Sequence, residues 1–103
     1  MNTPETHAVK DRYARRDGSA DAQRYSLYAN AATLQAQQER LRAMAALWRA
    51  HGWESLTGRP LLEVGCGSGA NLLDLLRLGA SPGQLTGIEL LPELATAART
   101  VLP

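Results

Sequence analysis

A glycine-rich segment in the middle of the chain, residues 65–69 (Gly-Cys-Gly-Ser-Gly), could bind a ligand through its main chain. A short apolar run, residues 60–64, ends directly at this segment, and a leucine-rich run over residues 70–78 follows it. Glycine allows the sharp turn and the positive φ values that such a junction needs, and it lets a ligand approach bare backbone. The first turn of a following helix offers N–H groups that have no intrahelical partner. The pattern therefore predicts a strand, a ligand-binding loop and a helix in direct succession.

An acidic residue, Glu89, stands about twenty residues after the glycine loop and ends a second apolar run over residues 84–89. In a parallel α/β sheet the carboxyl ends of neighbouring strands open into the same crevice. A carboxylate at that place can accept hydrogen bonds from both vicinal hydroxyls of a ribose. A glycine loop between a strand and a helix, followed by such an acid, predicts a site for an adenosine-type cofactor.

The type of cofactor depends on Glu63, an acid just before the loop. Gly65, Gly67 and Ala70 also satisfy the dinucleotide pattern G-x-G-x-x-A, so an oxidoreductase domain that binds NAD(P) or FAD is an alternative. A dinucleotide brings an anionic pyrophosphate, which the Glu63 carboxylate would repel. S-adenosyl-L-methionine has no phosphate and carries a cationic ammonium and a cationic sulfonium, which an acid attracts.

Two segments of the chain carry a resemblance to a known family. Residues 63–69 (Glu-Val-Gly-Cys-Gly-Ser-Gly) resemble the first motif of class I S-adenosylmethionine-dependent methyltransferases, acid-x-G-x-G-x-G. Residues 87–93 (Gly-Ile-Glu-Leu-Leu-Pro-Glu) resemble their second motif, in which an acid at the end of a strand holds the ribose. The resemblance covers about residues 58–102. It implies a methyltransferase that uses S-adenosyl-L-methionine and has an α/β fold with a Rossmann-like, doubly wound parallel sheet.

The resemblance also implies roles for individual residues. Gly65 and Gly67 would lie behind the methionine portion of the cofactor, and Glu63 would lie near its amino end. Glu89 would bind the ribose hydroxyls, and Leu90 would lie against the adenine. The full set of expected cofactor-binding residues is Glu63, Gly65, Cys66, Gly67, Ser68, Gly69, Asn71, Glu89 and Leu90.

Helical periodicity predicts the elements that position these residues. Apolar side chains recur with helical spacing over residues 31–50, and Asn30 can cap this helix. The leucine-rich helix 70–78 should be buried on most of its circumference, and Ser68 suits its cap. A further helix should begin at Pro92. The order strand, helix, strand, helix predicts two parallel strands joined by a right-handed crossover.

The chain supplies only the first two strands of the expected sheet, preceded by an N-terminal helical segment. We divide it into a polar N-terminal arm (residues 1–29), a helix with a linker (residues 30–57) and the truncated first half of the cofactor-binding domain (residues 58–103). In similar methyltransferases the later strands carry acceptor and catalytic groups, so we predict no catalytic residue. We expect the chain alone to be inactive and to self-associate through an exposed sheet edge. A non-catalytic remnant or interaction module is a third interpretation.

Composition excludes several classes of function. The 103 residues carry a net charge of +1, which argues against nucleic-acid binding and makes a small-molecule or glycan-type methyl acceptor the expected partner. The lone cysteine, Cys66, allows no internal disulfide and suits a cytoplasmic protein. Its place near a helix start predicts a lowered thiol pKa. The histidines and the cysteine have no metal-ligand spacing, and no apolar run approaches the roughly 20 residues of a membrane helix.

Overall fold

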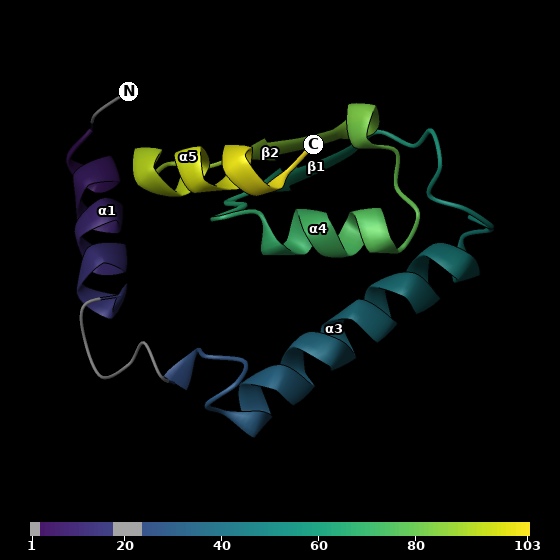
Figure 1. The fold of residues 1–103 in the computed structure, drawn as a ribbon, viewed down its shortest axis with the longest axis horizontal. Coiled ribbons are helices and arrows are strands. Elements are labelled where there is room, and N and C mark those ends of the chain that lie inside the picture. The colour runs from purple at the N-terminus through teal and green to yellow at the C-terminus, as the bar shows by residue number, and fades with distance from the viewer. Residues whose placement is uncertain (1–2, 18–23) are drawn as a thin grey trace. The chain divides into compact units, whose positions relative to one another are not determined.

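A computed structural model describes residues 3–17 and 24–103 of the chain, without the side chains of residues 13–17 (Figure 1). The chain divides into two compact units, Met1–Gly52 and Trp53–Pro103, and each is described by itself. No helix in the described residues is long and apolar enough to cross a membrane.

In the first unit the described residues include the helices α1 (Pro4–Asp17) and α3 (Ala31–Ala50). The α1 helix extends over 14 residues within the segment for which the sequence predicts a polar arm. Thr3 explains its start: the Thr3 hydroxyl accepts a hydrogen bond from the backbone N–H of Thr6 at 3.0 Å, and proline follows at the first helical position.

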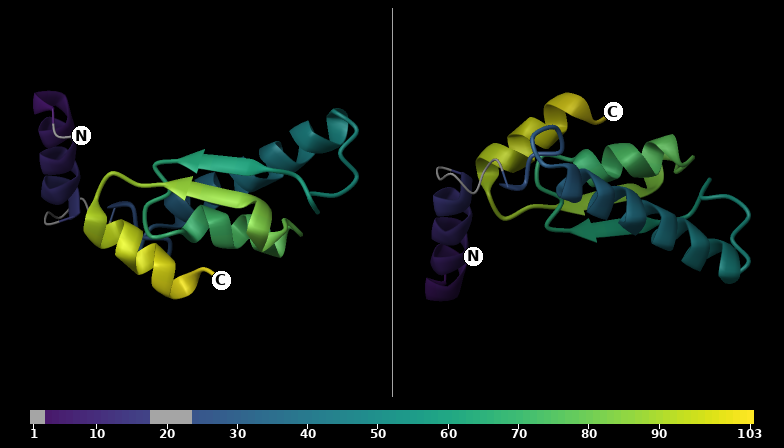
Figure 2. Two further views of the ribbon diagram at one scale, coloured as in Figure 1. Left: turned by 90° about the horizontal axis from the view of Figure 1, so that it is seen from above. Right: turned by 90° about the horizontal axis from the view of Figure 1, so that it is seen from below.

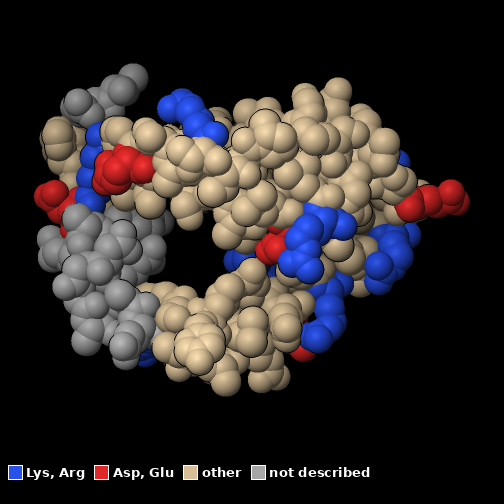
Figure 3. All heavy atoms as spheres, in the orientation of Figure 1, with Lys and Arg blue, Asp and Glu red and all other residues tan. Residues whose placement is uncertain are grey.

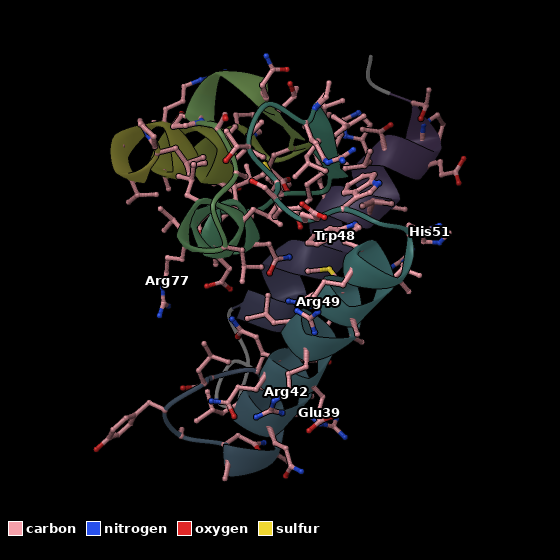
Figure 4. The ribbon with its side chains drawn as sticks, turned by 90° about the vertical axis from the view of Figure 1, so that its right-hand side faces the viewer. Glu39, Arg42, Trp48, Arg49, His51 and Arg77 are labelled. Carbon is pink, nitrogen blue, oxygen red and sulfur yellow. The ribbon has the colours of Figure 1, made fainter. Side chains whose placement is uncertain are left out.

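The α3 helix has the bounds that its periodicity predicts. The Asn30 side chain caps it and accepts hydrogen bonds from the N–H groups of Ala32 and Thr33 at 3.0 and 3.3 Å. No residue of α3 is fully buried, and Trp48 on its apolar face is half-buried. Arg42 and Glu39 lie one turn apart on this helix and form an exposed ion pair of 2.8 Å (Figure 4). Such a pair contributes only about 0.2–0.5 kcal/mol.

The second unit is a two-stranded parallel sheet with helical connections (Figure 2). Strand β1 (Leu61–Val64) leads through α4 (Ala70–Arg77) and a short 3-10 turn, η1 (Pro82–Gln84), into strand β2 (Leu85–Ile88), and α5 (Pro92–Val101) follows. The pairing aligns Leu61 with Leu85 and Val64 with Ile88. The expected parallel α/β arrangement is therefore confirmed. Each strand is shorter than predicted, since Pro60 and Glu89 lie outside the ladder and Gln84 belongs to the turn.

One face of this sheet is covered and the other is open. In Figure 1 α4 lies against the sheet, and its residues Leu72 and Leu75 are buried. On the opposite face Leu62 and Val64 are 60% and 75% exposed, because no element of the second unit covers them. Among the residues whose burial the structure describes, the buried apolar ones are Leu56, Leu72, Leu75, Ala80, Leu91 and Ala98.

The prediction that the leucine-rich helix is buried around most of its circumference is wrong. Leu73 and Leu78 are 37% and 44% exposed, and only the stripe that contains Leu72 and Leu75 faces the sheet. A two-stranded sheet is too narrow to cover more than one side of a helix about 10 Å wide. Gly79 has φ +105° directly after Leu78 and supplies the left-handed residue that ends many helices.

Two pairs of opposite charge lie along helices of the described residues. On the face shown in Figure 3, the Lys and Arg side chains of the described residues lie in separate groups, and acidic side chains stand beside some of them. Arg77, for example, lies 3.8 Å from Asp74 one turn earlier on α4.

Candidate functional site

The glycine loop between β1 and α4 is fastened to the end of β2. The N–H groups of Gly65 and Cys66 both donate to the carbonyl oxygen of Ile88, at 2.7 and 3.1 Å. The next N–H, that of Gly67, donates to Oε1 of Glu89 at 2.8 Å. Three successive loop amides thus find their acceptors on one short stretch of chain. Gly67 has φ +58° in this arrangement, a left-handed conformation that disfavours side chains with a Cβ.

Glu89 lies directly after β2 and both of its carboxylate oxygens are engaged. While Oε1 accepts from Gly67, Oε2 accepts from the N–H of Leu91 at 2.7 Å. Leu91 is buried, so the backbone group that holds this oxygen is itself fixed. An ionised carboxylate offers about four lone-pair sites. The two bonds to the backbone therefore orient Glu89 and leave it capacity for two further donors.

Glu63 lies in the middle of β1, opposite Gly87 in the ladder. Its Oε2 accepts a hydrogen bond of 2.6 Å from the side-chain amide of Asn71, in the first turn of α4. Its Oε1 is buried and has no hydrogen-bond partner among the described residues. A buried carboxylate oxygen without a donor is costly, at about 1–3 kcal/mol or more for a charged group. The site therefore contains an acceptor that a cationic or N–H-bearing ligand would satisfy.

The pKa of the half-buried Cys66 thiol reflects the charges around this loop. Burial raises the pKa of the Cys66 thiol, and the nearby Glu63 and Glu89 carboxylates raise it further. This corrects the predicted lowering of the thiol pKa by a helix start. The α4 helix begins only at Ala70, whereas the two acids lie close enough to oppose a third negative charge. The raised pKa disfavours the thiolate form, so the loop environment does not activate Cys66 as a nucleophile.

The residue that caps α4 differs from expectation. Ser68 was expected to cap α4, but the cap position is occupied by Gly69, with φ +94° and no side-chain hydrogen bond. A Cβ built on Gly69 would lie 3.1 Å from Cδ1 of Leu102, so this glycine lets the end of α5 approach the loop. Leu90, the expected adenine contact, is 41% exposed beside Glu89.

A cavity of about 560 Å³ lies beside β2 and α5. Cys66 and Glu89 are the expected cofactor-binding residues that line it, and Arg99 brings a positive charge. The remaining lining residues are Leu72, Gly87, Ile88, Ala95, Ala98, Leu102 and Pro103. A volume of this size falls within the range of small-molecule sites. Sequence reasoning missed the contribution of α5, although the lining positions 95, 98, 99 and 102 have the spacing of one helix face.

The structure thus joins the predicted residues into two pairs, Glu63 with Asn71 and Gly67 with Glu89. No cluster of metal-ligating side chains occurs in the part of the chain that the structure describes. Comparison with protein-family models, with curated proteins and with solved structures found no match to this chain. The functional argument therefore rests on the geometry of the loop and its two acids.

Proposed function

We propose that the chain carries the cofactor-binding part of an S-adenosyl-L-methionine-dependent methyltransferase, with the first two strands of a Rossmann-like sheet. The buried, unpartnered Oε1 of Glu63 carries this proposal. An acceptor oxygen of an acid beside a glycine loop suits the ammonium group of S-adenosyl-L-methionine and opposes a pyrophosphate. The bond from Asn71 to Oε2 fixes the carboxylate so that Oε1 is the oxygen left for a ligand.

Glu89 supports the same function from the other strand. Its carboxylate is held by two backbone N–H groups and lines the 560 Å³ cavity, so it is oriented before any ligand binds. The remaining lone pairs would accept the two hydroxyls of a ribose without breaking the bonds to the loop. Such preorganisation lowers the entropy cost of binding.

The chemistry that this cofactor supplies is an electrophilic methyl group on a sulfonium. The residues of this chain would bind and orient the cofactor, and positioning is the main contribution that a protein makes to such a displacement. The methyl acceptor that we propose is a small molecule or a glycan. We assign no catalytic base, since Glu63, Glu89 and Cys66 are all accounted for by binding or burial.

Calorimetric titration of the chain with S-adenosylhomocysteine and with NADH tests the proposal. We expect saturable binding of S-adenosylhomocysteine, weakened about tenfold or more by Glu63→Gln, because the neutral amide loses the charge that an ammonium seeks. Glu54→Gln is the matched control, since Glu54 is an exposed acid of the same unit outside the loop. Binding of NADH alone would favour the dinucleotide alternative, which Gly65, Gly67 and Ala70 keep open, and would overturn the proposal.

A further inference from the structure

The glycine loop already binds an anion from the same chain, the carboxylate of Glu89. In a strand–loop–helix junction, free loop N–H groups form a concavity that binds phosphate. Here the N–H groups of Gly65 and Cys66 donate to the Ile88 carbonyl, and that of Gly67 donates to the Glu89 carboxylate. Of these two acceptors only the Glu89 carboxylate is charged, and Glu89 lies 22 positions after Gly67 in the chain.

From this arrangement we infer that Glu89 is a specificity-determining residue that acts through the glycine loop: its carboxylate occupies the Gly67 N–H and thereby excludes phosphate-bearing ligands. A phosphate oxygen could reach this amide only by displacing Glu89. It would then lie beside the displaced carboxylate and near Glu63, with like charges on both. The inference deepens the proposed function and rests on it for the identity of the phosphate-free cofactor that the loop admits.

Two further observations support the exclusion of phosphate from the loop. The second oxygen of Glu89 is held at 2.7 Å by the N–H of Leu91, which is buried and precedes α5, so the side chain does not simply swing aside. Oε1 of Glu63 is buried and unpartnered, so an anion entering the loop would meet a second carboxylate, of which only Oε2 has a donor, from Asn71. Like-charge juxtapositions of this kind are unfavourable and suppress binding of the wrong partner.

The test uses the full chain labelled with 15N and 13C, with inorganic pyrophosphate as the probe. Two-dimensional amide NMR follows the Gly67 signal during titration of the wild type, Glu89→Ala and Glu93→Ala. Glu93 is the matched control, because it is an exposed acid in the first turn of α5 and its removal changes net charge equally. We expect only Glu89→Ala to show a saturable shift at Gly67, with an affinity at least about tenfold above the other two.

Equal pyrophosphate affinity in Glu89→Ala and Glu93→Ala would overturn the inference, as would tight binding at Gly67 in the wild type. Should Glu89→Ala lose its dispersed spectrum, the wild type still decides through the scalar coupling across the Gly67 N–H···Oε1 hydrogen bond. Absence of that coupling overturns the inference, and its presence together with tighter pyrophosphate binding by Glu89→Gln supports it. Titration with S-adenosylhomocysteine separates the two proposals: its failure to bind removes the proposed function and leaves the pyrophosphate result unaffected.

Discussion

Gly87 in β2 offers a sharp test of how the loop and α4 pack against the sheet. A Cβ at this position would lie 2.7 Å from Sγ of Cys66 and 2.8 Å from Cδ1 of Leu72, both well inside van der Waals contact. Leu72 is only 3% exposed and cannot retreat without disturbing the core. The φ of Gly87 lies outside the left-handed region, so Gly87→Ala introduces a steric conflict and no backbone strain.

Overpacking of this kind costs about 1–3 kcal/mol. With a urea dependence near 1 kcal/mol per molar for a small unit, the unfolding midpoint of Gly87→Ala should fall by about 1–3 M. Gly83→Ala is the matched control, because Gly83 also has no positive φ and a Cβ there would meet nothing within 4 Å. It should leave the free energy of unfolding within about 0.5 kcal/mol of the wild type. Adding Cys66→Ala to Gly87→Ala removes one of the two clashing atoms and should recover part of the loss.

Urea unfolding followed by far-UV circular dichroism, at one protein concentration for all variants, measures these midpoints. Equal midpoints for Gly87→Ala and Gly83→Ala would show that α4 and the loop do not pack on β2 as described. A double variant no more stable than Gly87→Ala would show that the Cys66 contact is misplaced.

The other predictions concern the loop, the open sheet face and the thiol. Gly67→Val should lower S-adenosylhomocysteine affinity at least tenfold by calorimetry while keeping most of the helical signal, because a β-branched residue resists φ +58° at about 1–2 kcal/mol. Leu62→Lys, on the open face of the sheet, should change the free energy of unfolding by less than about 0.5 kcal/mol. Leu72→Ala, in the core, should lower the free energy of unfolding by about 2–5 kcal/mol. Similar losses for both variants would mean that the face with Leu62 is covered. Because burial and two acids raise the pKa of Cys66, its alkylation by iodoacetamide should be slower at pH 7 than that of a free thiol, and Glu63→Gln should speed it by lowering that pKa; an unchanged rate would contradict the electrostatic part of this account.

Local patterns were sufficient to predict most of the elements. The bounds of α3 follow from its periodicity and from the Asn30 cap, and α5 begins at Pro92 as expected. The full length of α1 was not predicted, because residues 4–17 are mostly polar and contain few apolar residues. The extent of burial could not be predicted, since periodicity indicates which face is apolar and says nothing of how wide the covering sheet is.

The candidate site was predictable in its residues and not in its pairings. Motif spacing placed Glu63, Glu89 and the glycines on one junction. Motif spacing did not show that the Glu89 carboxylate accepts hydrogen bonds from two backbone N–H groups, because one of these bonds joins residues 22 positions apart. The prediction of a lowered Cys66 pKa was wrong for the same reason. It considered only near neighbours in the sequence, whereas the fold brings the carboxylates of Glu63 and Glu89 close to the thiol.

The fastening of the loop amides to the end of β2 sets the order in which this region can form during synthesis. A ribosome releases β1 and the loop before Ile88, Glu89 and Leu91 exist, so the N–H groups of Gly65, Cys66 and Gly67 first face water. Closing this segment of chain precedes any gain from those bonds and slows the step. The glycine loop therefore takes its final shape only after the end of β2 and the start of α5 have been synthesised.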